Sequence, residues 1–243
     1  MLQQIVKDYK IIIDENAIHS KGIAEGGSGA PKGMIFHILG NNQNPISILD
    51  IGFGTGGLAS LVKSNSATSH WHIDGIDGWE SNCKNKELIN KKLYRNIWHG
   101  LAQNIPAHQL AAYDIICLLD VIEHLDAETA KWLLRTLLTH MGEDAKLFIS
   151  TPLWFYPQDS QQQGDLEEHL IGIPASSMMA LIPIMYSINH PLIGGFVFNK
   201  KSLDFIDFFQ PTHNKKFSFN QGVIIASAIG LQQTPGVLFK TQK

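Results

Sequence analysis

Cysteine is scarce in this chain of 243 residues. Cys83 and Cys117 are its only cysteines, which is too few for a disulfide framework, and they do not have the spacing of a metal site. We therefore expect no bound metal. The first residues, MLQQIVKDYKIII, also lack the basic start, apolar core and small-residue cleavage site of a signal peptide, so we expect a cytoplasmic protein.

A surplus of positive charge is missing as well. Nineteen basic residues stand against 22 acidic ones, the formal net charge is −3, and the lysines and arginines form no stripe along the chain. Nucleic-acid partners are held by clustered basic side chains that neutralise phosphates. We therefore expect no nucleic-acid partner.

One long stretch has no charged residue at all. Residues 170–199 contain no Asp, Glu, Lys or Arg, and the first part approaches the length and apolarity of a membrane span. Pro174, Pro183 and the polar pair Ser176 and Ser177 argue against a span, so we expect none. We predict a buried or substrate-covering helix here, with an apolar substrate pocket or a homodimer face as alternative interpretations.

Short apolar runs alternate with helical patterns through the middle of the chain. Runs at residues 46–51, 71–77, 95–99, 113–118 and 146–150 predict strands, as does a later run at 223–228. Helices are expected at 57–63, at 81–92 with Ser81 as its cap, and from Asp126 to Gly142. This order predicts an α/β fold, doubly wound, with a mostly parallel, Rossmann-like sheet covered on both faces.

The segments around this sheet are expected to be additions to one domain. Residues 1–45 predict an N-terminal leader or lid, with a helix at 2–13 and a glycine-rich loop at 22–33. Residues 46–243 form the main domain. Within it, residues 153–199 are expected to be a helical, substrate-covering insertion towards the C-terminus.

The stretch ILDIGFGTGG, residues 48–57, has two incompatible interpretations. As Gly52-x-Gly54-x-x-Gly57 it fits the fingerprint of a dehydrogenase that binds NAD. As Asp50-x-Gly52-x-Gly54-x-Gly56 it fits a loop that binds S-adenosylmethionine. Glycine serves both ligands because it tolerates positive φ and close approach, so the glycines do not discriminate.

Asp50 discriminates between the two ligands. We expect it at the carboxyl end of its strand, facing the ligand, where it would repel a pyrophosphate by on the order of 1 kcal/mol and attract an ammonium or a sulfonium. No tyrosine is followed by a lysine four residues later, so the catalytic pair of short-chain dehydrogenases is also missing. Asp77 ends the next strand and can accept ribose hydroxyls of either ligand.

Several motifs in a fixed order carry a resemblance to a known family. They are ILDIGFGTG at 48–56, GIDGWE at 75–80, GLAQNIP at 100–106, YDIICLLDVIEHL at 113–125 and LFISTP at 147–152. Together they resemble the class I S-adenosylmethionine-dependent methyltransferases. The resemblance implies a Rossmann-like methyltransferase fold and S-adenosylmethionine as cofactor.

It also implies positions for the cofactor-binding residues. Asp50, Gly52, Phe53, Gly54 and Gly56 would surround the methionine portion, Asp77 the ribose, Gly78 and Trp79 the adenine, and Asp120 the methionine or the methyl group. Such proteins often have Gly-Asp-Ala in the third motif, where this chain has Gly100-Leu101-Ala102. Backbone groups of Leu101 and Ala102 would then hold the adenine without the acid.

The expected function is therefore an enzyme that transfers a methyl group in line to oxygen or nitrogen of a small-molecule, sugar or lipid-like acceptor. Asp120, His124 and His169 are the candidate catalytic residues, since a base is needed when the acceptor must lose a proton. Glu123 is a further candidate, although Glu123 and His124 would equally order the turn. The alternatives are a degenerate nucleoside-binding protein that acts as a partner subunit and, less favoured, an NAD-dependent oxidoreductase.

Overall fold

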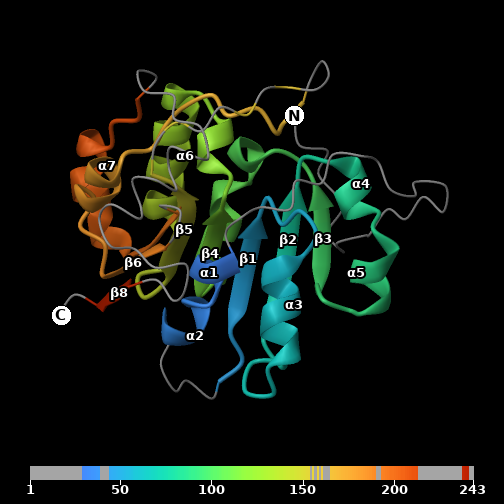
Figure 1. The fold of residues 1–243 in the computed structure, drawn as a ribbon. Helices are drawn as coiled ribbons and strands as arrows, with labels where there is room; N and C mark the ends of the chain where they lie inside the picture. Colours follow the sequence, from blue (N-terminus) through green and yellow to red (C-terminus); the bar gives the residue numbers. More distant parts are fainter. Residues whose placement is uncertain are drawn as a thin grey trace.

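The structure, a computed structural model, describes residues 29–38, 44–153, 155, 158, 160, 165–189, 193–212 and 237–240. These residues form an eight-stranded sheet in the order β3-β2-β1-β4-β5-β7-β6-β8 (Figure 1). The strands in chain order are β1 (Ser47–Ile51), β2 (His72–Asp77), β3 (Asn96–His99), β4 (Ile115–Leu119), β5 (Lys146–Pro152), β6 (Met185–Asn189), β7 (Ile193–Phe198) and β8 (Val237–Lys240). The pairings among β1 to β5 are parallel, and those of β7 with β5, β6 with β7 and β8 with β6 are antiparallel.

Apolar side chains cover both faces of this sheet. One core cluster joins the sheet to α6 (Ala127–His140), η2 (Ala107–Ala112) and η4 (Lys200–Phe208). The other joins it to α2 (Ile35–Ile38), α3 (Gly57–Ser64) and the segment of α4 (Glu80–Cys83) and α5 (Lys86–Asn90). All five residues of β4 are buried because this strand lies in the middle of a parallel sheet with both faces covered. The predicted mostly parallel, doubly wound sheet is thus confirmed.

The predicted strands at 46–51, 71–77, 95–99, 113–118 and 146–150 correspond to β1 to β5. The helix at 57–63 is α3, and Asp126 caps α6 as expected, its side chain accepting from the backbone N–H groups of Glu128 and Thr129. The single helix expected at 81–92 is wrong. It is divided into α4 and α5 because Asn85 leaves the helical conformation and its side chain accepts from Glu87 N, which starts a second helix.

The helix expected in residues 170–199 is also wrong. Among the described residues of this stretch only α7 (Ala175–Met179) is helical, and the chain then forms β6 and β7. Every residue of β7 is buried between β5 and β6, which explains why this part of the chain carries no charge. An apolar run of this length does not by itself distinguish a buried strand from a buried helix.

Some sequence predictions lie outside the described residues. These are the helix at 2–13, most of the glycine-rich loop at 22–33 and the strand at 223–228. The end of that loop forms α1 (Gly29–Lys32), which contacts β6 and β7. Among the described residues, none of the helices combines the length and the apolar character that crossing a membrane requires. A homodimer face at 170–199 stays a prediction.

Candidate active site

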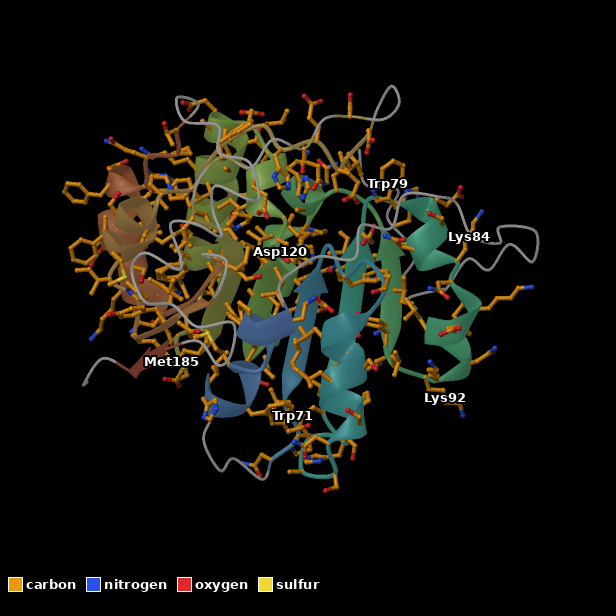
Figure 2. The ribbon with its side chains drawn as sticks, viewed as in Figure 1. Trp71, Trp79, Lys84, Lys92, Asp120 and Met185 are labelled. Atoms are coloured by element: carbon orange, nitrogen blue, oxygen red, sulfur yellow. The ribbon has the colours of Figure 1, made fainter. Side chains whose placement is uncertain are left out.

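A cavity of about 290 Å³ opens at the carboxyl ends of β1, β2 and β4. In Figure 2 Trp79 and Asp120 lie at this end of the sheet, whereas Trp71 lies at the opposite end. The chain passes from β1 to β2 on one side and returns to β4 on the other, which is where ligands bind in open α/β sheets. The lining is completed by Pro152 at the end of β5, by Ile193, and by Gln158, Leu166, Glu167 and His169.

The glycine turn after β1 forms the floor of the cavity. Gly52, Gly54 and Gly56 have φ values of 68°, 53° and 77°, in the left-handed region that favours glycine. A Cβ on Gly52 would collide with Val121, whereas a Cβ on Gly54 would meet nothing within 4 Å. Gly54 therefore leaves open space for a ligand against its backbone. Gly52, Phe53 and Gly54, three of the residues expected to bind the cofactor, all line the cavity.

Gly56 has a different task from the expected one. It does not line the cavity, and a Cβ on it would lie 2.5 Å from Leu88 Cδ2 in the core. Gly56 starts α3 and lets this helix pack against α5, while the adjacent Gly57 lines the cavity. The glycine pattern is therefore shared between the ligand side and the core side of the turn.

Asp77 at the end of β2 holds the glycine turn in place. Its Oδ2 accepts from Gly54 N at 2.8 Å, and its Oδ1 accepts from Trp79 N at 2.7 Å and from Asn82 Nδ2 at 3.1 Å. Burial raises the pKa of Asp77, and the hydrogen bonds partly offset this rise. Asp77 also lines the cavity, so the same carboxylate is available to a ligand and fixes the turn beside it.

Next to Asp77 the cavity has one polar and one apolar wall. The Oδ1 of Asn82 is buried and has no hydrogen-bond partner among the described residues. Leu101 and Leu166 lie over Gly78, where a Cβ would lie 3.0 Å from Leu101 Cδ2 and would collide with Leu166. This wall suits a flat apolar group with polar edges. Gly78, Leu101 and Ala102, which were expected to hold the adenine, line the cavity.

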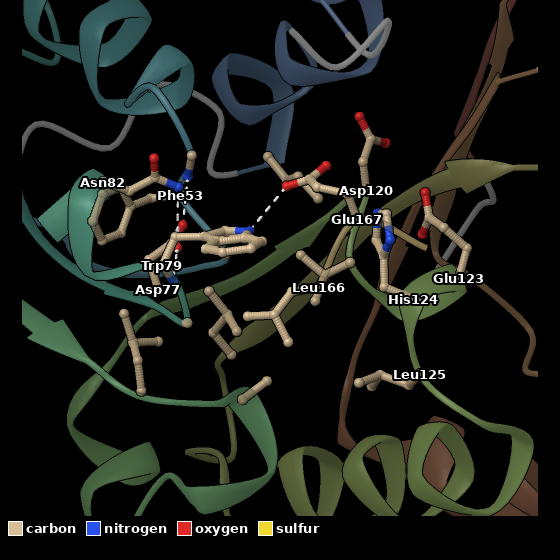
Figure 3. Close-up of a pocket in the computed structure, with 18 of the residues that line it drawn as sticks. Phe53, Asp77, Trp79, Asn82, Asp120, Glu123, His124, Leu125, Leu166 and Glu167 are labelled. Carbon is tan, nitrogen blue, oxygen red and sulfur yellow. Dashed lines mark hydrogen bonds between the residues drawn. The ribbon is translucent and has the colours of Figure 1, made fainter. Parts of the chain in front are cut away.

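Trp79 joins the two sides of the cavity mouth. Its indole Nε1 donates to Glu167 Oε1 at 3.2 Å, across 88 positions of sequence (Figure 3). The Gln158 side chain donates to the Glu167 carbonyl at 2.6 Å. These bonds bring Gln158 and residues 165–167 next to Trp79 at the end of β2, beside the predicted adenine-binding positions.

Asp50 was expected to face the ligand, but it does not line the cavity. It is 2% exposed, lies beneath the glycine turn and accepts from the Tyr94 hydroxyl at 2.8 Å. Burial raises its pKa to about 6, an effect that the Tyr94 hydrogen bond and the charge of Lys32 partly oppose. The residue was expected to face the ligand because it ends the strand, but the alternation of side chains along β1 turns it to the face that Tyr94 covers.

The other end of the cavity carries acidic and imidazole groups. Asp120 follows β4 with φ of 54°, and its Oδ1 accepts from the Ser150 hydroxyl at 2.8 Å. Glu123 is 2% exposed and accepts from the Thr151 hydroxyl at 3.2 Å. Burial, and then the charge of Asp120, raise the pKa of Glu123 well above its usual value.

His124 and His169 meet edge to face in the same region, with ring centroids 4.6 Å apart. Burial lowers the pKa of His124, so its ring is neutral at pH 7. Its Nδ1 lies 3.1 Å from the Glu168 carbonyl oxygen, and since a carbonyl only accepts, Nδ1 carries the proton. The three candidate catalytic residues, Asp120, His124 and His169, thus line one cavity together with Glu123.

These residues also form a cluster that the cysteine count did not suggest. One ring nitrogen of His124, one of His169 and a carboxylate oxygen of Glu123 all lie within 4.8 Å of one another. The expectation of no metal rested on the cysteines, whereas this cluster brings together histidines from two distant segments of the chain.

Several lining residues were missed by sequence reasoning. Lys32 comes from α1, Asn82 from α4, and Gln158, Leu166 and Glu167 from the segment after β5. Asn82, five residues after Asp77, had a usable signal, since it is one of the polar residues of the short helix that directly follows the β2 motif. The others belong to no motif, and only the fold brings them to the cavity.

Solved structures share this architecture. The chain aligns with a Burkholderia thailandensis 1,6-didemethyltoxoflavin-N1-methyltransferase, solved with 1,6-didemethyltoxoflavin and S-adenosylhomocysteine bound, over 70% of this chain and 77% of the other, with 12% identity and a TM-score of 0.53. The plantazolicin methyltransferase BpumL in complex with S-adenosylhomocysteine aligns over 51% of this chain and 46% of the other, with 24% identity and a TM-score of 0.41. The mitomycin 7-O-methyltransferase MmcR aligns over 71% of this chain and 54% of the other, with 14% identity and a TM-score of 0.49. The chain spans about half the length of the first solved structures it matches.

Comparison with curated proteins gives no match. The sequence profile described as a methyltransferase domain matches residues 34–180, which is more than half of the chain. The matched region contains β1 to β5 and every motif from the glycine turn to the strand that ends at Pro152. The chain therefore belongs to the methyltransferase-domain family.

Proposed function

We propose that this protein is an S-adenosylmethionine-dependent methyltransferase that acts on a small-molecule, sugar or lipid-like acceptor. The observation that carries the proposal is one continuous cavity with two different ends. The glycine turn and Asp77 form one end, and Asp120, Glu123 and two histidines form the other. A nucleoside cofactor suits the first end, and proton transfer from an acceptor suits the second.

The first end fits the cofactor in shape and polarity. The open space over Gly54 admits a ligand close to the backbone. The carboxylate of Asp77 retains acceptor capacity beside its bonds to Gly54, Trp79 and Asn82, since a carboxylate offers about four acceptor positions. The unpaired Asn82 Oδ1 adds a buried acceptor that a ribose hydroxyl or an amino group would satisfy.

The second end suits the acceptor. S-adenosylmethionine supplies a methyl carbon already activated by a positively charged sulfur. The chain has to align the acceptor with that carbon and exclude water, for which orientation alone can contribute about 7–11 kcal/mol in well-oriented cases. His124 is neutral, and the proton on its Nδ1 leaves a lone pair on Nε2, so His124 can accept a proton from an acceptor hydroxyl or ammonium.

Two alternative functions have less support than methyl transfer. An NAD-dependent oxidoreductase lacks support from the catalytic tyrosine-lysine pair, which is missing from the sequence, and from the family. A partner subunit that only binds nucleoside would not need the group of Asp120, Glu123, His124 and His169 at the far end of the cavity. Methyl transfer uses both ends.

Titration calorimetry of the purified protein with S-adenosylmethionine and, separately, with NADH tests the proposal. We expect heat with S-adenosylmethionine alone. In Gly54→Ala, the new methyl group enters the open space over the turn, and we expect affinity at least tenfold weaker. Gly142→Ala is the matched control, because its Cβ would make only ordinary contacts, 3.6 Å from Ala111 O and 3.7 Å from Ala145 Cβ, and it does not line the cavity.

Binding of NADH alone, or no binding of either ligand, would contradict the proposal. Equal affinities of Gly54→Ala and Gly142→Ala for S-adenosylmethionine would show that the cofactor lies elsewhere. The acceptor is then sought by incubating the protein and labelled S-adenosylmethionine with fractionated metabolites and following transfer of the label.

A further inference from the structure

Glu123 is a buried carboxyl group that lines the cavity and has no basic partner among the described residues. It is 2% exposed, and among the described residues it forms no ion pair with Lys, Arg or His. The hydroxyl of Thr151 donates a hydrogen bond to it at 3.2 Å. Asp120 lies close enough to act on it as a second negative charge. A buried carboxylate of this kind is stabilised by a bound cation.

The backbone fixes the two histidines beside this carboxylate. The carbonyl oxygen of Glu123 accepts from Leu170 N at 2.9 Å and from Ile171 N at 3.2 Å, and His169 N donates to Gln158 O at 2.9 Å. His169 is therefore tied to η3 (Ile122–His124) although it comes from a distant segment of the chain. Figure 3 shows the side chains of Glu123 and His124 at the same end of the pocket.

The hydrogen bond of His124 is one that metal-binding histidines commonly make. Its Nδ1–H donates to a backbone carbonyl, that of Glu168, which fixes the tautomer and leaves Nε2 with a lone pair. A ligand histidine needs its ring oriented in this way before the metal arrives. The same contact also holds residue 168 next to the ring, and with it His169.

We propose that Glu123, His124 and His169 bind one divalent transition-metal ion, which holds an oxygen atom of the methyl acceptor. Two imidazoles and a carboxylate are a ligand set of zinc, manganese and iron sites with open positions, and imidazole disfavours magnesium and calcium. The three ligand atoms lie within 4.8 Å of one another. Ligand atoms at about 2.1 Å from a tetrahedral ion are about 3.4 Å from one another. Side-chain rotations that move these atoms by about 1 Å would therefore bring them to coordination distance.

The role of the metal in catalysis rests on the proposed function. Because Nε2 of His124 then binds the ion, this ring no longer serves as the base. An acceptor hydroxyl bound to the ion loses its proton more readily, and the proton passes to the carboxylate of Asp120 or to water. The oxygen lone pair then forms the O–C bond to the methyl carbon as the C–S bond breaks, and sulfur keeps that electron pair as a neutral thioether. The inference thus narrows the acceptor to a molecule that presents an oxygen atom.

Cobalt(II) is the probe for the metal site. The protein is treated with chelator, dialysed and titrated with Co²⁺, and visible absorption bands report coordination while calorimetry gives the affinity. We expect one equivalent to bind to the wild type and to His70→Ala, an exposed histidine that does not line the cavity. In Glu123→Gln and His169→Ala, Co²⁺ should bind at least tenfold more weakly. S-adenosylhomocysteine titrations of each variant verify that the cofactor end is intact.

The outcomes separate the two proposals. Absence of Co²⁺ binding, or equal affinities in all four proteins, overturns the metal site, whether or not S-adenosylhomocysteine binds. Binding of Co²⁺ without S-adenosylhomocysteine binding overturns the proposed function and leaves the metal site standing. Acetohydroxamate, a small oxygen ligand, should shift the Co²⁺ bands if the ion has open positions. Unchanged bands would overturn the part of the inference that concerns the acceptor.

Discussion

Asp50 is a residue whose observed position differs from the one its motif predicts. The motif predicts a carboxylate facing the cofactor, but Asp50 lies under the turn with its oxygen on the Tyr94 hydroxyl. The ring of Tyr94 packs at 5.0 Å from that of Phe53, which does line the cavity. An ionised Asp50 therefore acts on a bound cation through its field and through the position of Phe53, without direct contact.

The buried position of Asp50 gives a pH prediction. Its pKa is raised from 3.8 to about 6. The folded state therefore holds a proton that the unfolded state has released, so the contribution of Asp50 to stability is full below pH 3.8 and is lost as the pH rises through 6. Asp50→Asn removes this dependence and keeps an acceptor for Tyr94. From pH 4 to pH 7 we expect the variant to gain up to about 3 kcal/mol in free energy of unfolding relative to the wild type, measured by urea denaturation.

The comparison between the two proteins cancels the other carboxylates, which titrate in both. A difference in free energy of unfolding that does not change between these pH values would mean that Asp50 is not buried as described.

Helix α6 is the element that the sequence specifies most completely. Its buried residues, Ala130, Leu133, Leu134, Leu137 and Leu138, repeat at helical spacing, and Asp126 caps its start. The cap lies only two residues after His124, so the helix start also ends the turn that carries Glu123 and His124. By contrast, the segment at 81–92 has helical composition but is divided at Asn85, because a local side-chain bond competes with the helix there.

Removal of the α6 cap should lower stability without changing the cofactor site. The side chain of Asp126 accepts from Glu128 N at 3.1 Å and from Thr129 N at 3.0 Å. Asp126→Ala is expected to lower the free energy of unfolding by about 1 kcal/mol, and Asp126→Asn by less, since asparagine is also a good cap. Denaturation at pH 7 measures both, and calorimetry should give unchanged affinity for S-adenosylhomocysteine. Equal stability of the alanine and asparagine variants would show that the cap contributes little.

At the scale of the whole molecule, the sequence predicted the part built from repeating units. Strands β1 to β5 follow from apolar runs, and their carboxyl ends bring Gly54, Asp77 and Asp120 to one edge because parallel strands end together. Residues 165–171 belong to the stretch at 153–199 that was expected to cover the substrate, and His169 was a candidate site residue, but the contacts that hold this segment over that edge could not be predicted. Nothing periodic marks it, and it is held by single contacts such as those of Glu167 with Trp79 and of Leu170 with Glu123.

The strands β6 and β7 escaped prediction for another reason. These strands lie inside the sheet, between β5 and β8. A strand buried on both faces is apolar throughout, so its sequence lacks the alternation of polar and apolar residues that marks a half-exposed strand. The lack of charge in residues 170–199 correctly indicated burial, but it led to the prediction of a helix where the chain forms the strands β6 and β7. The sequence therefore specified which side chains are inside more reliably than the backbone conformation that puts them there.

If residues 165–171 are part of the ligand site, hydrogen exchange should respond to ligand at both walls of the cavity. This segment joins β2 through Trp79 and η3 through Glu123, so opening it would expose a bound nucleoside. With S-adenosylhomocysteine at about 100 times its Kd, the ligand opposes such opening by about 2.7 kcal/mol, and exchange of the amides should slow by up to about 100-fold. We expect this slowing at residues 52–57 and at 165–171, measured by mass spectrometry.

The last turn of α6, around His140, does not line the cavity and serves as the internal control. Slowing at the glycine turn with none at 165–171 would mean that this segment opens without releasing the ligand, and the acceptor end built on His169 would then be separate from the cofactor end.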